Sequence, residues 1–245
     1  MAKNTLLVDG DIVAFQAAIS TEQPTKYDED TWILWASESD TKAKFDDMMQ
    51  TLTEKSGAAD VIVAFTDKVN FRKELCDTYK ANRAKTRKPM LLPLLRDYCT
   101  NRYRTLCYSR LEADDVLGIC GTYEPLFEEP IIWSIDKDLM QIPGLHLVED
   151  EIVEVTPEQA DYFFLKQVLT GDQADNYAGC KGIGEKRATA ILDADPTWDA
   201  VVKTYEKAGL TEEDALFQAR LARILRHGDY NMEKGKVKLW SPDGR

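Results

Sequence analysis

Cysteine and histidine are scarce in this sequence, and long hydrophobic runs are absent. The 245 residues include five scattered cysteines without a Cys-x-x-Cys pair, and only two histidines, His146 and His227. This usage argues against a disulfide-stapled scaffold and against a zinc site. Apolar runs such as Val61–Phe65 are too short to span a membrane, and no signal-peptide pattern opens the sequence, so we expect a cytoplasmic protein with no membrane partner.

Positive charge is also in short supply, with 31 Lys and Arg against 43 Asp and Glu and a net charge of −12. Taken as a whole, this balance argues against a nucleic-acid-binding protein. The charge is unevenly distributed, however. Residues 68–104 hold eleven basic and three acidic residues, so this segment is +8 and the rest of the chain is −20. The function must therefore explain where the excess carboxylates lie.

The order of apolar runs is typical of an α/β protein. Runs at Thr5–Val8, Val61–Phe65 and Pro130–Ile135 predict buried strands. Segments with helical patterns separate them, which favours a mainly parallel central sheet flanked by helices. We further expect a short strand at Arg104–Tyr108, a helix at Glu112–Cys120, a hairpin over Leu145–Val155, a polar loop over residues 21–30 and mostly helices after Thr156.

Acidic residues follow the predicted strands at the point where each strand ends. Asp9 follows the first strand, Asp67 the second, and Asp136 with Asp138 the third. Because ligands of open α/β sheets bind at the carboxyl ends of the strands, we expect these acids to meet in one cleft. Two more groups have the spacing to join them, namely Glu112, Asp114 and Asp115 at a helix start, and Asp172 with Asp175. Taken singly, such acids are usually helix caps or turn residues, and that alternative stays open for each.

Nine carboxylates in one cleft would repel one another strongly unless cations neutralised them. Ligation by oxygen alone suits Mg²⁺ or Mn²⁺. Two such ions can hydrolyse a phosphodiester, one by activating water and the other by stabilising the leaving oxygen. The sequence contains no Ser-His-Asp arrangement, P-loop or dinucleotide motif that would point to different chemistry.

A glycine-rich segment predicts a phosphate contact. Gly182-Ile183-Gly184 precedes an amphipathic helical pattern, which places bare backbone N–H groups at a helix N-terminus. Lys181, Lys186 and Arg187 add positive charge around it. Such a site would hold a nucleic-acid backbone without recognising its sequence. A Gly-x-Gly pair alone is more often a simple turn, but its position after two aspartates favours the phosphate contact.

The basic segment is interleaved with aromatic residues, as is typical of a nucleic-acid clamp. Lys80 and Arg83 share a face if this stretch is helical, and they could stabilise the charge of a scissile phosphate opposite the metals. The alternative is an ordinary solvated face. The residues that we expect to contact nucleic acid here are Tyr79, Lys80, Arg83, Lys85, Arg87 and Lys88.

These motifs, in this order, resemble the flap endonuclease and 5′→3′ exonuclease family. The resemblance covers nearly the whole chain, and the end of the chain, residues 222–240, resembles the smaller podovirus exonucleases. Its elements are Leu7-Val8-Asp9-Gly10, Ala64-Phe65-Thr66-Asp67, Tyr79-Lys80-Ala81-Asn82-Arg83, Glu112-Ala113-Asp114-Asp115, Ser134-Ile135-Asp136-Lys137-Asp138, Gly171-Asp172-x-x-Asp175-Asn176 and Gly182-Ile183-Gly184-Glu185-Lys186.

The resemblance implies a PIN-like nuclease fold. Residues 1–155 would form the α/β nuclease core, with a basic helical arch at about 71–104. Residues 156–245 would form a mostly helical part packed on the core as one unit. This part would contain a helix-two-turn-helix motif at about 172–192, which in the family holds duplex DNA and often a K⁺ ion. The segment available for the arch is short for a closed, threading arch.

The resemblance also implies the activity, a 5′→3′ exonuclease and flap endonuclease that uses Mg²⁺ or Mn²⁺. Its substrates would be DNA with a 5′ end, flap or nick and RNA–DNA hybrids, with a role in phage replication, primer removal and DNA degradation in the host cytoplasm. One metal would be held by Asp9, Asp67, Glu112 and Asp114, the second mainly by Asp136, Asp138, Asp172 and Asp175, with Asp115 shared or in the outer sphere. Lys80 and Arg83 match the catalytic positions at the base of the arch. Oligomeric state stays open.

Two other functions compete with this one. In a haloacid-dehalogenase-type phosphatase, Asp9 and Asp11 would act as nucleophile and acid, but Asp67, the Glu112 group and the basic segment would have no role. A non-catalytic DNA-binding module would explain the glycine hairpin and the basic segment, but not so many acids.

Overall fold

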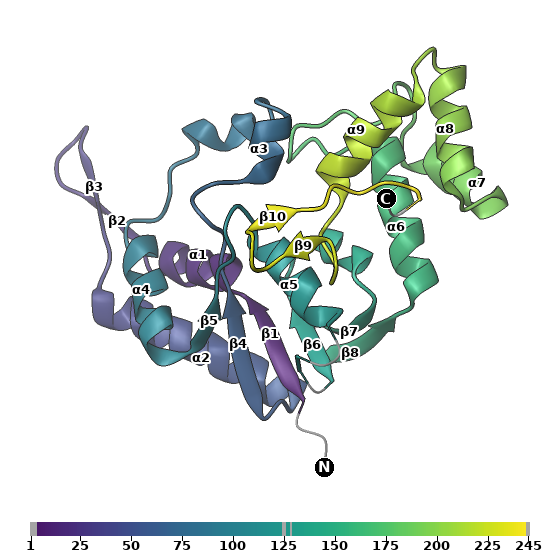
Figure 1. Cartoon of the computed structure of the whole chain (residues 1–245). Helices are drawn as coiled ribbons and strands as arrows, with labels where there is room; N and C mark the ends of the chain where they lie inside the picture. Colours follow the sequence, from purple (N-terminus) through teal and green to yellow (C-terminus); the bar gives the residue numbers. More distant parts are fainter. Residues whose placement is uncertain (1–3, 124–125, 128, 244–245) are drawn as a thin grey trace.

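The centre of the fold is a mainly parallel sheet (Figure 1). The structure is a computed structural model that describes residues 4–123, 126–127 and 129–243. In this part of the chain a six-stranded sheet has the order β5-β4-β1-β6-β7-β8. Its strands are β1 (Thr5–Asp9), β4 (Asp60–Ala64), β5 (Arg104–Leu106), β6 (Pro130–Trp133), β7 (Gly144–Val148) and β8 (Glu151–Val155). Within this sheet only β7 and β8 pair antiparallel, as the predicted hairpin, so the expected fold class is confirmed.

The register of the three central strands brings their carboxyl ends level. Asp9, the last residue of β1, pairs with Ala64 on β4, and the residue before it pairs with Trp133 on β6. Asp67 and Asp136 each lie three residues beyond the end of their strand. The strand-end acids therefore lie along one edge of the sheet, as the sequence predicts.

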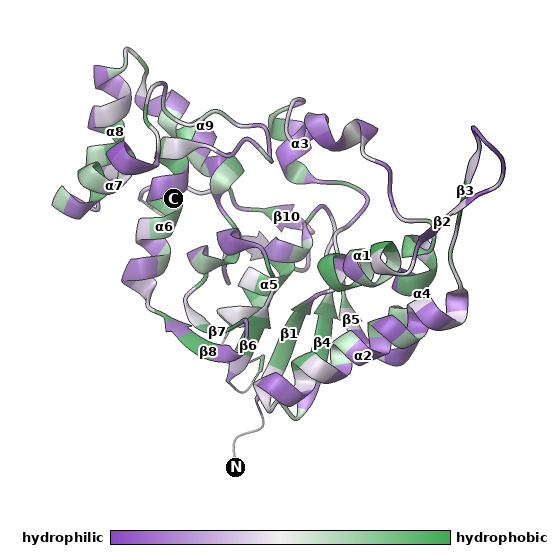
Figure 2. Ribbon diagram, turned by 180° about the vertical axis from the view of Figure 1, so that it is seen from behind, coloured by the Kyte–Doolittle hydropathy of each residue, from purple (hydrophilic) through white to green (hydrophobic). Residues whose placement is uncertain are grey.

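Helices cover both faces of the sheet. One face carries α1 (Gly10–Ser20), α2 (Glu38–Ser56) and α4 (Leu92–Arg102), and the other carries α5 (Ala113–Gly121). Leu6 and Val8 of β1 pack with the first group and Leu7 packs with α5, as the two-residue period of a strand requires. Figure 2 shows these central strands as hydrophobic and the outer face of α2 as largely hydrophilic.

Gly10 allows α1 to begin directly at the end of β1. A Cβ at this position would lie 2.5 Å from Val63 Cγ1 and 2.8 Å from the Ala64 carbonyl oxygen on β4. Contacts that short are not tolerated, so only glycine allows the helix to start against the sheet. This fixes the direction in which the Asp9 side chain leaves the strand.

A helical layer follows residue 156. It consists of α6 (Pro157–Thr170), α7 (Glu185–Ala194), α8 (Trp198–Lys207) and α9 (Glu212–Ala222). Capping boxes at Thr156 and Thr211 fix the starts of α6 and α9. Tyr205 is fully buried between these helices. The chain then returns to pack beside α5 through β9 (Tyr230–Asn231) and β10 (Lys236–Val237). No described helix is long and apolar enough to cross a lipid bilayer.

The prediction of a loop over residues 21–30 is wrong. This region contains β2 (Gln23–Lys26), which pairs antiparallel with β3 (Trp32–Trp35) in a projecting hairpin (Figure 1). Asp28 Oδ1 accepts hydrogen bonds from the Asp30 and Thr31 N–H groups and closes the turn. Because nearly every side chain of both strands is exposed, the hairpin has no alternating apolar pattern that could predict it.

The predicted arch is shorter than residues 71–104. Its last helix, α4, packs on α1 and α2 and buries Leu95 and Cys99, so it belongs to the core. Its first helix, α3 (Phe71–Leu75), buries Phe71 and Arg72. Between these helices the chain forms turns at residues 77–80 and 90–91 and one short 3₁₀ helix, η1 (Ala81–Lys85).

Candidate active site

A serine links two of the strand-end acids. Asp9 caps α1 by accepting from the Ile12 N–H at 3.1 Å, and its other oxygen accepts from Ser134 Oγ at 3.0 Å. Ser134 Oγ in turn accepts from the Asp136 N–H at 3.1 Å. Asp136 Oδ1 accepts from the Asp138 N–H at 2.9 Å and caps the 3₁₀ helix η2 (Lys137–Gln141). The ends of β1 and β6 are thus held together with their carboxylates side by side.

The N-terminus of α5 supplies Glu112, whose carboxylate is buried among donors. Lys80 Nζ lies 2.5 Å from its Oε1, and Arg72 Nη1 lies 3.2 Å from its Oε2. The Tyr79 hydroxyl donates to Oε2 at 3.0 Å. Burial alone would raise the pKa of Glu112, but Lys80 and Arg72 lower it to about 2. Glu112 is therefore a carboxylate with its charge compensated.

The loop after α6 brings Asp172 and Asp175 to the same place. Asp172 Oδ1 accepts from the Ala174 and Asp175 N–H groups, at 2.6 and 3.2 Å, and shapes the turn. The loop closes because Gly171 and Gly179, both with positive φ, leave no room for a Cβ between their backbones. Asp175 then reaches the Tyr79 hydroxyl at 2.9 Å.

A cavity of about 20 Å³ lies between these elements. Five acids line it, namely Glu112, Asp114, Asp136, Asp138 and Asp175. Burial is the largest cause that raises the pKa of Asp9 to about 7, and the charge of Asp11 is the second. Burial, followed by Asp136, raises the pKa of Asp138 to about 6, and burial with Asp9 raises the pKa of Asp114 well above its usual value. On this side of the cavity, negative charge lacks compensation.

The chemistry of these residues fits a divalent cation. The donors are carboxylate oxygens, and buried Asp138 Oδ1 has no hydrogen-bond partner. Within the described residues, however, no three acidic, histidine or cysteine side chains surround one point as ligands of an ion do. Lys80 instead holds Glu112 and Asp175 from one side.

Lys80 and Arg83 both reach Asp175, which lines this cavity. Lys80 Nζ lies 3.4 Å from Asp175 Oδ2, and Arg83 Nη2 lies 2.7 Å from Asp175 Oδ1. Lys80 adopts positive φ just before η1, and its N–H donates to the Asp175 carbonyl. Burial alone would lower the pKa of Lys80, but Glu112, Asp175 and Asp114 raise it above its usual value, so the ammonium stays charged.

Asp115 is not available as a metal ligand, which corrects the predicted shared or outer-sphere role. Its side chain is 0% exposed, and its two oxygens accept four hydrogen bonds. Two come from Arg72, at 2.7 Å each, and the others come from the Glu112 and Leu225 N–H groups. Every lone-pair position of the Asp115 carboxylate is taken, so Asp115 fixes the position of the neighbouring residues and does not bind a metal.

The predicted DNA contact of Tyr79 is wrong as well. Tyr79 is 3% exposed, and its hydroxyl bonds Glu112 and Asp175 inside the protein. Arg87 is exposed, but both of its terminal nitrogens pair with Glu22 beside the β2–β3 hairpin, and its contact with nucleic acid stays a prediction. Lys85 and Lys88 are exposed, and their contact with nucleic acid stays a prediction.

Asp67 lies at the margin of the site and does not line the cavity. Its oxygens accept from the Lys68 and Arg110 N–H groups at 2.7 Å, and the bond from Arg110 leads the causes that lower its pKa. A metal-ligand role for Asp67 stays a prediction. Beside it, Arg96 of α4 donates to the Thr66 carbonyl at 2.6 Å and lies 3.7 Å from Asp11.

Sequence reasoning missed three residues that hold this site, namely Arg72, Arg96 and Ser134. The two arginines belong to the basic segment 68–104, and sequence does not distinguish a buried arginine from an exposed one. Ser134 lies in the predicted strand Pro130–Ile135, two residues before Asp136, and its place in the Ser134–Asp138 motif is its only signal.

The glycine hairpin has the predicted form. Gly182 has a φ of 79°, and Gly184 is the N-cap of α7 with no side chain bonded to the helix end. Lys181, Lys186 and Arg187 around it are exposed. With the turn at Asp172–Tyr177, two turns connect α6 to α7.

Comparison with known proteins shows the family of this chain. The family described as 5′-3′ exonuclease, N-terminal resolvase-like domain, matches residues 4–167. The chain belongs to the 5′–3′ exonuclease family. It is 31% identical to an exonuclease of Escherichia phage T7, over 98% of this chain and 94% of the relative. It is also 31% identical to an exodeoxyribonuclease of Enterobacteria phage T3, over 98% of this chain and 93% of that one.

Solved structures share the fold of this exonuclease-family chain. A flap endonuclease of bacteriophage T5, in a pseudo-enzyme–product complex with DNA and metal ions, superposes with a TM-score of 0.69. It is 18% identical and covers 90% of this chain and 89% of its own. The 5′-exonuclease of the same phage with zinc bound gives the same TM-score at 19% identity.

Proposed function

We propose that this exonuclease-family chain hydrolyses phosphodiester bonds of DNA with a 5′ end, flap or nick, as a metal-dependent 5′→3′ exonuclease and flap endonuclease. The observation that carries the proposal is the cavity at the strand ends, where uncompensated carboxylates face the fixed charges of Lys80 and Arg83. The DNA and metal ions bound by the T5 neighbour support it.

Two Mg²⁺ or Mn²⁺ ions would be held by the acids around the cavity. Asp9, Glu112, Asp114 and, from its margin, Asp67 would hold one, and Asp136, Asp138, Asp172 and Asp175 the other. When bound, the ions would activate water and stabilise the charge of the leaving oxygen. The glycine hairpin would hold the duplex, with K⁺ as a further ligand there.

The protein's own cations would act on the phosphate. Lys80 is held close to the acids and stays charged, so it can move from Glu112 and Asp175 to a phosphate oxygen when cations take over those carboxylates. Arg83 is half-exposed and can follow. Both would stabilise negative charge that grows during cleavage. We also propose a role in DNA replication, primer removal and DNA degradation in a host cytoplasm, including cleavage of RNA–DNA hybrids. Of these, DNA degradation by a phage enzyme is what the names of the two phage relatives support.

One assay tests the proposal directly. The protein is incubated with Mg²⁺ and a 5′-labelled flap or nicked duplex, and in parallel with a small phosphomonoester. We expect cleavage of the DNA near its 5′ end and no phosphate release from the monoester. Hydrolysis of the monoester alone would favour a phosphatase, and binding of DNA without cleavage in Mg²⁺ or Mn²⁺ would favour a binding module.

Lys80→Ala is expected to lower kcat by roughly 100- to 1,000-fold, because it removes a charge aimed at the reacting phosphate. Affinity for DNA should change little, since the duplex would be held elsewhere. Single-turnover cleavage and equilibrium binding measure the two separately. Lys73→Ala, an exposed change in the same segment, is the matched control, and a Lys80→Ala enzyme with the kcat of this control would remove the proposed contact.

Divalent cations are expected to stabilise the folded protein without any substrate. At 100 times the dissociation constant the gain is about 2.7 kcal/mol in the free energy of unfolding. Thermal unfolding with Mg²⁺ or Mn²⁺, compared with NaCl of equal ionic strength, measures it. The gain should shrink in Asp138→Asn, because this change removes the negative charge of the carboxylate that carries the unpaired oxygen. An equal rise with NaCl would show screening and not binding.

A further inference from the structure

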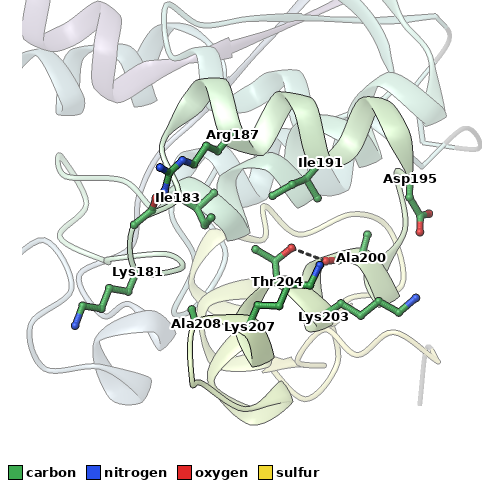
Figure 3. A pocket seen from close by; sticks show the side chains of 11 residues that line it. Lys181, Ile183, Arg187, Ile191, Asp195, Ala200, Lys203, Thr204, Lys207 and Ala208 are labelled. Carbon is green, nitrogen blue, oxygen red and sulfur yellow. Dashed lines mark hydrogen bonds between the residues drawn. The ribbon is translucent and has the colours of Figure 1, made fainter.

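A basic groove lies between α7 and α8 (Figure 3). It has a volume of about 420 Å³, and none of the described acids around the strand-end cavity lines it. Four cations line it, namely Lys181, Arg187, Lys203 and Lys207, against one acid, Asp195. In a chain with a net charge of −12, this is a local reversal of sign.

The four cations of the groove form no ion pair within the part of the chain that the structure describes. Within the described chain, no acid forms an ion pair with any of the four, and only Arg187 makes a side-chain hydrogen bond, to the Gly182 carbonyl at 2.9 Å. By contrast, Lys42 and Lys44 on α2 each pair with an acid of their own helix. The groove therefore holds positive charge that an external anion can neutralise.

The helix α8 carries part of this positive charge on its exposed side. Val201 and Tyr205 are buried on one side of α8, while Lys203 and Lys207 are exposed one turn apart on another. Like charges at this spacing repel each other, so the pair is unfavourable until an anion binds. The neighbouring Thr204 hydroxyl is already bonded to the Ala200 carbonyl at 2.7 Å, which leaves recognition to the lysines.

The shape of the groove favours a long anion over a single phosphate. In Figure 3, Lys181 and Lys203 point to opposite ends of the pocket. Lys181, Gly182 and Ile183 belong both to the groove and to the glycine hairpin, so the two surfaces are continuous. A phosphate chain held at the hairpin can therefore continue past α8.

We propose that the groove between α7 and α8 binds the phosphate backbone of the duplex arm beyond the glycine hairpin, with Lys203 and Lys207 as its outer contacts. This proposal rests on the proposed nuclease function. It assigns DNA contacts to α8, a helix outside the predicted hairpin motif. Since the contacts are to phosphates, they lengthen the footprint without selecting a sequence.

The test compares the wild type with Lys203→Ala/Lys207→Ala on flap substrates whose duplex arms lengthen in steps of about half a helical turn, ~5 base pairs. The wild type should bind more tightly once the arm reaches α8. The double variant should lose this gain, with a Kd roughly tenfold higher on long arms and unchanged on short arms. Its slope of log Kd against log salt concentration should fall by about 2.

Controls separate the possible outcomes. Lys42→Ala/Lys44→Ala removes the same charge from α2 and should bind like the wild type, whereas Lys203→Arg/Lys207→Arg should retain the gain. Equal loss in both alanine pairs, or equal binding of long and short arms by the wild type, would overturn the proposal. So would competition by a deoxynucleoside monophosphate as effective as duplex at equal phosphate concentration. If the double variant still cleaves short-arm flaps at the wild-type kcat, the nuclease function stands whatever the result on long arms.

Discussion

Asp136→Ala is expected to reduce DNA cleavage by roughly 1,000-fold or more while DNA binding persists. Asp136 lies at the end of β6 and lines the cavity, and its charge contributes to the raised pKa of Asp9, Asp114 and Asp138. Because Asp136 interacts with three other acids in this way, a cation bound at Asp136 would be stabilised most strongly. The glycine hairpin and the basic residues that would hold the duplex are left intact. Single-turnover cleavage and a binding titration measure the two effects.

Asp136→Asn distinguishes the charge of Asp136 from its role as a cap. Asparagine keeps the oxygen that accepts from the Asp138 N–H, but it removes the charge. It should be as inactive as the alanine variant. In a metal chelator it should unfold at a higher temperature than the wild type, because one of the mutually repelling carboxylates is gone. Recovery of cleavage in Asp136→Asn would assign the loss to the cap, and Glu154→Gln, an exposed acid on β8, controls for a general effect of charge.

The framework of this site could be predicted from the sequence because it depends on local rules. Apolar runs fix β1, β4 and β6, and an acid after each run must then lie at the same edge of a parallel sheet. Lys80 and Arg83 do lie together, since both reach Asp175, but Lys80 precedes the 3₁₀ helix η1 with positive φ, so the two do not share a helix face as their spacing suggested.

The remaining features depend on contacts between distant segments, which periodicity does not encode. Nothing local distinguishes Arg72, which is 2% exposed, from Lys73, which is exposed. Asp115 has the i, i+3 spacing of a ligand partner to Glu112, and only the position of Arg72 shows that its oxygens are occupied. Likewise, the β2–β3 hairpin has no apolar face, so its pairing leaves no hydrophobic pattern in the sequence.

Arg72 connects the acid-bearing end of α5 to the end of α9. All five of its N–H donors are used, toward the Asp115 and Glu112 carboxylates and the Leu221 and Arg223 carbonyls. The bonds to Asp115 are bidentate, at 2.7 Å each. Burial alone would lower the pKa of Arg72, but Asp115 leads the contacts that raise it above its usual value. The folded state therefore contains a buried positive charge that compensates two buried negative ones.

Arg72→Met is expected to lower the free energy of unfolding by about 3–5 kcal/mol, because it leaves the charge of Asp115 buried without a partner. Denaturant unfolding measures this loss, and Lys73→Ala should change the value by less than about 0.5 kcal/mol. Adding Asp115→Asn to Arg72→Met removes the stranded charge and should restore part of the stability. A loss that the second change does not reduce would mean that packing, and not the ion pair, is what Arg72 supplies. Cleavage should stay low in the double variant even where it is folded, since Glu112 has lost one of the two cations that fix its carboxylate.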